Sequence, residues 1–198
     1  MKGIELKNLT KNYGKNCALD NVSVKFDSGK IYGLLGRNGA GKSTMLNLIS
    51  NRIFPTSGEI LIDGEPSIEN DRALSKVYCM SEKNLLPANM KFKEAVKITK
   101  HFYPRLDENY AFKLAEMYEL APKKKLGSLS TGYNSIYKII LALSCNADYV
   151  FFDEPVLGLD AHHRDLFYKE LLKKYIDIGG TYIISTHLID CLLYTSPS

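Results

Sequence analysis

A glycine-rich segment at residues 36–44, Gly-Arg-Asn-Gly-Ala-Gly-Lys-Ser-Thr, constrains the fold of this chain more than any other. It fits the pattern G-x-x-x-x-G-K-[ST]. The apolar run Ile31–Leu35 before it predicts a strand, and the apolar spacing within residues 45–49 after it predicts a helix. Its glycines let several backbone N–H groups face one anion, and the start of the helix adds partial positive charge. The segment therefore predicts a phosphate-binding loop.

The residue types in this loop predict how it holds a nucleoside triphosphate with a magnesium ion. We expect Lys42 to contact the β- and γ-phosphates of ATP, and the Ser43 hydroxyl to ligate the Mg²⁺ that bridges them. The other nucleotide contacts are expected from the remaining loop residues, which are Gly36, Asn38, Gly39, Ala40, Gly41 and Thr44. The loop alone does not separate kinases, GTPases and motor ATPases, because all of them share it.

Two acidic residues follow another apolar run and predict the hydrolytic part of the site. The run Tyr149–Phe152 is typical of a strand buried on both faces of a parallel sheet, and Asp153 and Glu154 come directly after it. Asp153 is expected to hold Mg²⁺ through its water shell, and Glu154 to orient or deprotonate the attacking water. Acids at a strand end can instead cap the next helix, but a phosphate loop upstream favours the catalytic interpretation.

The remaining pattern predicts an α/β fold: a P-loop NTPase core, a mostly parallel sheet with flanking helices, that carries an N-terminal antiparallel β subdomain and a helical subdomain. Apolar residues alternate in the first 26 residues, which predicts strands, and Asp63-Gly64 between extended segments predicts a hairpin. Helical spacing from Lys91 to Cys145 places the helical subdomain at about 83–145.

Strand character returns at Tyr182–Ser185, with a predicted helix over Asp165–Tyr175 before it. The 198 residues, of which 45% are hydrophobic, suit one globular domain. We therefore interpret 1–198 as a single domain.

Composition argues against a nucleic-acid partner, and the spacing of the cysteines argues against disulfides and zinc. Lysine and arginine number 26 against 22 acidic residues, an excess of four that is too small to favour nucleic acid. We interpret Lys123–Lys125 as a solvated face. The four cysteines show no paired CxxC spacing, which favours reduced thiols over a disulfide framework or a zinc site.

No apolar run approaches the roughly 18 residues of a membrane-spanning helix. The N-terminus also lacks the apolar core of a secretory signal. The chain is therefore expected on the cytoplasmic side, with any membrane-spanning part supplied by another chain.

A third segment, Leu129–Tyr133, connects these elements to a known family. Its sequence, Leu-Ser-Thr-Gly-Tyr, resembles the LSGGQ signature of ABC ATPases, and Ser130 stands 23 residues before Asp153. The family's other motifs appear in the same order: Tyr13 before the loop, Glu82 after an apolar run, Gly158-Leu159-Asp160, and His187 near the end. Over nearly its whole length the chain is similar to the nucleotide-binding subunit of an ABC transporter.

The resemblance implies a head-to-tail pair of such domains, a homo- or heterodimer with two ATP molecules between the subunits. Each ATP lies between the phosphate loop of one subunit and the signature of the other. Ser130, Thr131 and Gly132 open a helix whose positive end can face the γ-phosphate. By the same resemblance Tyr13 stacks on adenine, His187 contacts the γ-phosphate and Asp160 reports across the dimer.

Three positions depart from the family pattern. Glu82 stands where the family usually has glutamine; a carboxylate can still meet Mg²⁺ but cannot donate a hydrogen bond. Together with Thr131 in the signature, it resembles exporter-like bacterial members and favours export. Tyr133 replaces the signature's glutamine, and the sequence gives it no role.

The C-terminal end also departs from the family, because only 11 residues follow His187. The family normally continues with further strands and helices, so the chain is expected to be truncated. Residues 191–198 resemble translated sequencing-adaptor read-through, and we expect no function from them.

These features predict an ATPase that powers an ABC transporter through a separate integral membrane permease, from the inner face of the membrane. The permease is expected to dock near Glu82 and residues 84–90. Two alternatives stay open. One is a soluble ABC ATPase acting on ribosomes or DNA, although such proteins usually carry two cassettes or a long coiled coil. The other is a switch that binds ATP without hydrolysing it.

Overall fold

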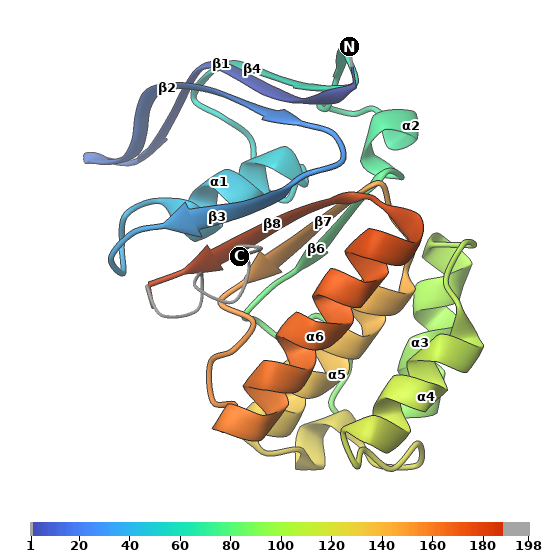
Figure 1. The fold of residues 1–198 in the computed structure, drawn as a ribbon. Coiled ribbons are helices and arrows are strands. Elements are labelled where there is room, and N and C mark those ends of the chain that lie inside the picture. The colour runs from blue at the N-terminus through green and yellow to red at the C-terminus, as the bar shows by residue number, and fades with distance from the viewer. Residues whose placement is uncertain (1, 188–198) are drawn as a thin grey trace.

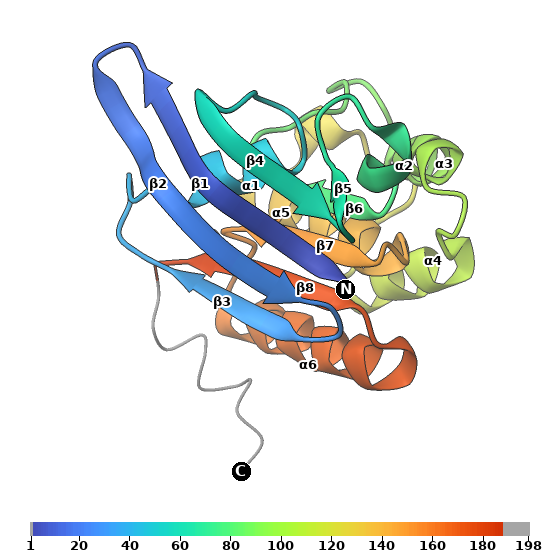
Figure 2. The same ribbon diagram turned by 90° about the horizontal axis from the view of Figure 1, so that it is seen from above.

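The computed structural model describes residues 2–187 and builds them into two sheets with helices around them (Figures 1 and 2). The first sheet is antiparallel, in the order β2-β1-β4-β5. Its strands are β1 (Gly3–Tyr13), β2 (Asn16–Asp27), β4 (Ser57–Ile62) and β5 (Glu65–Pro66). Asp63 and Gly64 both have positive φ, 55° and 84°, at the turn between β4 and β5, so the predicted hairpin is confirmed.

The second sheet is parallel, in the order β3-β8-β7-β6. Its strands are β3 (Ile31–Leu35), β6 (Val77–Met80), β7 (Tyr149–Asp153) and β8 (Thr181–Thr186). Parallel strands need long crossovers, and the helices supply them. All four strands therefore end at one edge, where β3 leads into the phosphate loop and β7 ends in Asp153.

The central strand β7 is buried on both faces, as its apolar run predicts. Tyr149 and Phe151 pack into the core between the two sheets, which also holds helix α1. Val150 and Phe152 pack into the core beneath α5 and α6. This alternation follows from the period of two along a strand.

The helices lie between the sheets and on the far face of the parallel sheet (Figure 1). They are α1 (Lys42–Ile49), α2 (Asp71–Leu74), α3 (Phe92–Phe102), α4 (Glu108–Met117), the 3₁₀ turn Leu126–Ser128, α5 (Thr131–Ser144) and α6 (Ala161–Ile178). Three of these helices lie in the 83–145 region, whose boundaries as a subdomain stay a prediction. Within residues 2–187, none of the helices is long and apolar enough to cross a bilayer.

Helix α6 is longer than predicted, since the sequence pattern indicated only residues 165–175. Asp160 explains the earlier start, because its carboxylate accepts a hydrogen bond from the His163 N–H at 2.8 Å and caps the helix. At its C-terminal end the helix continues through Ile176 and Ile178, which are 78% and 58% exposed. These exposed apolar residues do not follow the helical spacing from which a helix can be predicted.

Two of the cysteines lie in apolar surroundings. Cys79 and Cys145 are buried, while Cys17 is exposed, and all three are free thiols. Burial raises the pKa of Cys79 to about 11 and that of Cys145 to about 12. The fourth cysteine, Cys191, lies outside the described residues, as does the rest of the 191–198 segment.

Candidate nucleotide-binding and hydrolysis site

The loop between β3 and α1 has the backbone that its glycines predict. Gly39 and Gly41 have φ of 84° and 86°, in the left-handed region. Gly41 is also closely packed, because a Cβ built there would lie 2.6 Å from the Ala18 carbonyl oxygen and 2.8 Å from Leu19. The loop is thus held against β2, and with His187 it lines a cavity of about 600 Å³.

Because of this close packing, we expect Gly41→Ala to disturb ATP binding more than an alanine at any other glycine of the loop. We expect the substitution to weaken ATP binding at least tenfold, because backbone strain and the clash with β2 must displace the loop. Gly39→Ala is the matched control, since its φ is similar but no atom of residues 2–187 lies within 4 Å of the added Cβ. Equal ATP dissociation constants for the two variants would show that contact with β2 does not shape the loop.

Lys42 is turned inward at the start of α1 and is only 8% exposed. Its ammonium donates hydrogen bonds to the carbonyls of Gly36, at 2.6 Å, and Arg37, at 3.2 Å. The Glu154 carboxylate lies 3.5 Å away. A buried ammonium needs such partners, and those it has are the loop's own backbone and one acid.

Asp153 joins three elements at the edge of the parallel sheet. Its Oδ1 accepts hydrogen bonds from the hydroxyls of Ser43, at 2.9 Å, and Ser185, at 2.8 Å. Its side chain caps no helix, because α6 is capped by Asp160, so the capping interpretation of this acid is wrong. The donor set of hydroxyl and carboxylate oxygens suits Mg²⁺, which prefers oxygen ligands.

Glu154 is held in a strained conformation next to the loop, with a φ of 48°. Its backbone N–H donates to the Ser185 hydroxyl at 3.1 Å, and its Oε2 lies 3.0 Å from Nδ1 of His187. Its Oε1 is buried and accepts no hydrogen bond from the described residues, although Lys42 is nearby. A buried carboxylate oxygen without a donor suits a group that has yet to receive a proton or a water.

Ser185 is the residue that sequence reasoning missed. It receives its place from the parallel register that pairs Ser185 of β8 with Asp153 of β7. Its position at the end of an apolar run could have marked it as a candidate. The strand order that brings Ser185 beside Asp153, however, cannot be predicted from the residues around either one.

Glu82 lies beyond β6 and shares a hollow of about 230 Å³ with Asp153 and Glu154. The side chain of Lys138, on α5, lines the same hollow and donates a hydrogen bond to the main-chain carbonyl of Glu82. Burial lowers the pKa of the Lys138 ammonium, and the charge of Glu82 opposes that shift.

The signature residues lie at the start of α5, where Thr131 lines the hollow that also holds Glu82, Asp153 and Glu154. The Ser130 hydroxyl accepts a hydrogen bond from the Tyr133 N–H at 3.3 Å and caps the helix. Gly132 approaches Gly158 so closely that a Cβ would lie 2.7 Å from the Gly158 carbonyl oxygen. Ser130 lines a cavity with Tyr133 and Leu129 that contains no phosphate-loop residue.

Asp160 and Tyr133 meet at one histidine. The pKa of Asp160 is lowered, chiefly by the His163 N–H that its carboxylate accepts. Tyr133 contacts the His163 ring edge to face, with centroids 6.3 Å apart, so this departure from the family pattern packs beside the signature.

Tyr13 ends β1 at the tip of the β1–β2 hairpin, where it pairs with Asn16. Its ring is 49% exposed, and the Lys11 ammonium lies 5.1 Å from the ring centroid. The same hairpin leads into the segment at residues 18–19 that packs on Gly41. A half-exposed aromatic ring on the hairpin that packs against the phosphate loop suits a stacked base.

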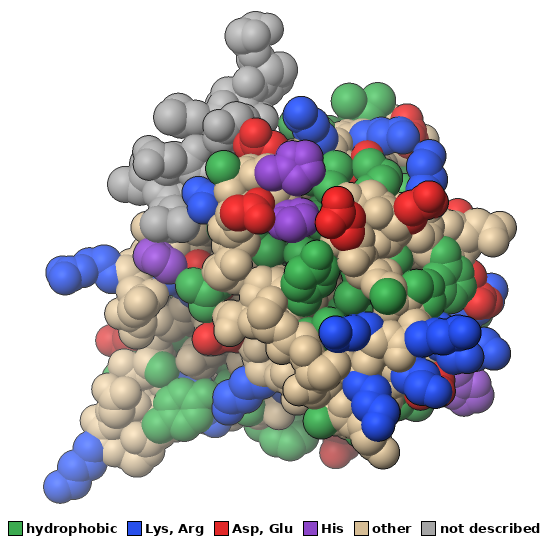
Figure 3. Space-filling view, turned by 90° about the horizontal axis from the view of Figure 1, so that it is seen from below, with side chains coloured by type: hydrophobic (Ala, Val, Ile, Leu, Met, Phe, Trp, Pro, Cys, Tyr) green, Lys and Arg blue, Asp and Glu red, His purple; other side chains and the backbone are tan. Residues whose placement is uncertain are grey.

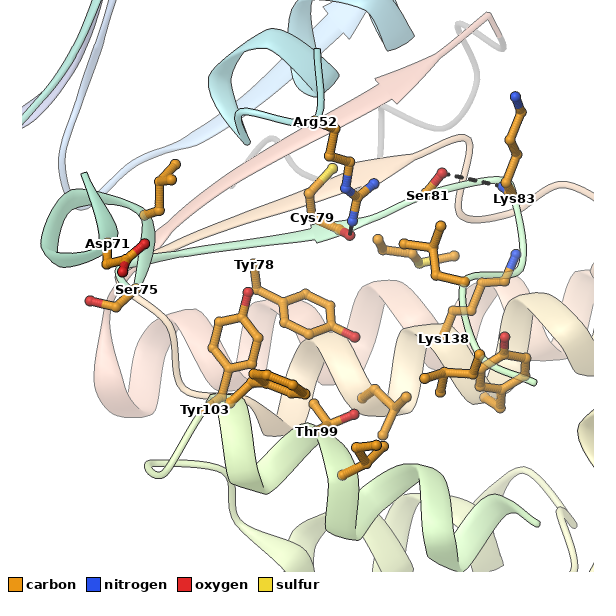
Figure 4. A pocket seen from close by; sticks show the side chains of 18 residues that line it. Arg52, Asp71, Ser75, Tyr78, Cys79, Ser81, Lys83, Thr99, Tyr103 and Lys138 are labelled. Atoms are coloured by element: carbon orange, nitrogen blue, oxygen red, sulfur yellow. Dashed lines mark hydrogen bonds between the residues drawn. The ribbon is translucent and has the colours of Figure 1, made fainter. Parts of the chain in front are cut away.

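A second concave feature lies away from the phosphate loop, between β6, α3 and α5 (Figure 4). This groove has a volume of about 450 Å³ and is mostly apolar. It exposes Leu85, Ile98 and Phe102 at 63%, 39% and 69%, and Lys138 points across its end toward the loop with Ser81 and Lys83 (Figure 4). Large apolar side chains exposed around one groove indicate a binding surface.

Figure 3 shows acidic, basic and apolar side chains side by side on the face seen from below. Lys123–Lys125 are all exposed, which agrees with a solvated face.

Comparison with known proteins places this geometry in a family. The family model described as ABC transporter matches residues 19–157. The ABC transporter ATP-binding protein YtrB of Bacillus subtilis is 33% identical over 94% of this chain, and the petrobactin import ATP-binding protein YclP of the same organism is 31% identical over 94%. The chain spans 64% of the length of YtrB and 78% of YclP.

Solved structures agree with the sequence relatives. A dimeric bacterial ABC transporter cassette superposes with a TM-score of 0.84 at 27% identity, covering 96% of this chain and 90% of that chain. A dimeric post-hydrolysis state of an ATP-binding cassette, bound to ADP and Pi, gives a TM-score of 0.83 at 27% identity, with the same coverage. The chain therefore belongs to the ABC transporter family and has the fold of its ATP-binding cassettes.

Proposed function

We propose that this chain binds ATP with Mg²⁺ and hydrolyses it to power a transporter. The observation that supports this most strongly is that two contacts form at one sheet edge: the Ser43 hydroxyl donates to Asp153 at 2.9 Å, and the Lys42 ammonium lies 3.5 Å from the Glu154 carboxylate. The oxygen donors of Ser43 and Asp153 fit Mg²⁺, and the buried Glu154 oxygen, which accepts no hydrogen bond from the described residues, fits a general base.

The chain's own residues divide the work of hydrolysis. Lys42 exchanges its bonds with loop carbonyls for the β- and γ-phosphates, and the loop N–H groups hold the same oxygens. Ser43 and Asp153 would hold Mg²⁺, and Glu82 lines the same hollow as Asp153. When bound, Mg²⁺ neutralises charge as the phosphate bond breaks. Glu154 takes the proton of the attacking water, and His187 orients that carboxylate.

The site is half of a composite site. Ser130 caps α5 and lines a cavity with Leu129 and Tyr133, so the positive start of this helix is available to the γ-phosphate bound by a second subunit. Asp160 at the start of α6 lies beside the signature and suits contact across the dimer. Dimeric cassettes among the similar structures support this arrangement.

The direct test is phosphate release from ATP. The chain is expected to release phosphate from ATP in the presence of Mg²⁺ and to stop when EDTA removes the metal. ATP that binds but is never cleaved, with or without Mg²⁺, would instead establish the non-hydrolysing switch.

ATP hydrolysis by this chain drives a membrane permease on a separate chain, and this chain lies at the inner face of the membrane. The similar proteins include those named for petrobactin import and for bacitracin transport. The groove of Figure 4 is the docking surface, because it is apolar, exposed and begins at the loop that carries Glu82.

Phe102→Glu tests this docking surface. With a charge in the groove, we expect at least a tenfold loss of co-purification with a co-expressed integral membrane permease, since burying an unpaired carboxylate is costly. Ile176→Glu is the matched control, because Ile176 is 78% exposed but lies on α6, outside the groove. Equal losses for both variants would place the partner elsewhere.

A further inference from the structure

Three residues on one face of α5 hold the loop that follows β6. Asn134 Oδ1 accepts a hydrogen bond from the Asn84 side-chain amide at 3.2 Å, and the Tyr137 hydroxyl donates to Asn84 Oδ1 at 3.3 Å. Lys138 donates to the main-chain carbonyl of Glu82. Positions 134, 137 and 138 are spaced i, i+3 and i+4, so they lie on one helix face. The loop is therefore anchored to the helix that begins at the signature.

Among these anchors, Lys138 alone lines both concave features. Its side chain borders the apolar groove and also the hollow with Glu82, Asp153 and Glu154. Figure 4 shows it pointing from α5 toward the loop after β6. A lysine stem can pack along apolar surface while its ammonium meets a polar group. Lys138 thus forms part of the wall between the docking groove and the acids.

We propose that Lys138 is a positioning residue that fixes Glu82 at the hydrolysis pocket and links occupancy of the groove to that pocket. By bonding the carbonyl of residue 82, it fixes the backbone from which the Glu82 carboxylate extends. A partner that fills the groove contacts the stem of the same lysine. The inference deepens the proposed function and rests on it for the role of the pocket, but the anchoring of the loop can be measured without nucleotide.

Lys83 supplies the measurement, because it is an exposed trypsin site one residue beyond the anchored carbonyl. In the absence of nucleotide, Lys138→Met is expected to raise the rate of cleavage between Lys83 and Asn84 about fivefold, the scale of one lost hydrogen bond. Met keeps the apolar stem and removes only the donor. Lys138→Arg keeps a donor and is expected to stay near the wild-type rate.

A second readout separates positioning from simple loosening. We expect kcat for Mg²⁺-ATP hydrolysis to fall about tenfold in Lys138→Met and to be largely restored in Lys138→Arg, while the ATP dissociation constant in EDTA stays within about twofold. Lys97→Met, on the exposed side of α3, is the control for loss of a lysine.

The outcomes of the two readouts are distinguishable. An unchanged cleavage rate at Lys83 in Lys138→Met would overturn the proposal, as would a loss of kcat that Arg does not restore. A wild-type chain that binds no ATP would instead overturn the proposed function, and the nucleotide-free cleavage rates would still decide whether Lys138 anchors the loop.

Discussion

Glu154→Gln is expected to slow ATP hydrolysis about a hundredfold or more while ATP still binds, which is the usual scale for losing a general base. The substitution keeps the size of the side chain and removes its ability to take a proton. It also removes the charge 3.5 Å from Lys42, so that lysine is freer to meet phosphate. Phosphate release under single-turnover conditions, with ATP binding measured separately, distinguishes the two effects.

Glu116→Gln is a suitable control, because Glu116 is exposed on α4, away from the acids of the site and from the cavity that Ser130 lines. It is expected to hydrolyse ATP at the wild-type rate. Normal turnover in Glu154→Gln would remove Glu154 from the role of base and would leave its strained backbone without a function.

Lys42→Met is expected to weaken ATP binding by about ten- to a hundredfold, because hydrogen bonds to charged groups contribute about 1.5–3 kcal/mol each. Hydrolysis should fall further, since the lysine also stabilises charge on the transferring phosphate. Met retains most of the buried stem, so the loop keeps its packing. Calorimetric titration with ATP and Mg²⁺ measures the loss.

A control for Lys42→Met must also remove a lysine charge, but at a position outside the phosphate loop. Lys97→Met removes an exposed lysine on α3 and is expected to bind ATP as the wild type does. Similar ATP affinity in Lys42→Met and Lys97→Met would mean that the inward ammonium serves the loop's fold and not its ligand.

The features that sequence predicted best are those encoded within a few neighbouring residues. The phosphate loop needs glycines at fixed spacing, and Gly39 and Gly41 do have positive φ. The turn at Asp63-Gly64 follows the same logic. β7 was readable because a strand buried on both faces is apolar throughout.

The features that sequence missed depend on which strands and helices become neighbours. Ser185 meets Asp153 only because β8 lies next to β7, although the two residues are 32 positions apart. Lys138 reads as one polar residue in an amphipathic helix, and its bond to the Glu82 carbonyl spans 56 positions. Such contacts follow from the global packing, which no local pattern specifies.

The position of the metal tests the assignment of the site most directly. In crystals of the Glu154→Gln chain grown with ATP and Mn²⁺ in place of Mg²⁺, an anomalous difference map should show one ion in contact with Ser43 Oγ on its Asp153 side. The β- and γ-phosphates should lie at the start of α1, within hydrogen-bond distance of Lys42 Nζ. A nucleotide bound elsewhere, or an ion that does not touch Ser43, would contradict it.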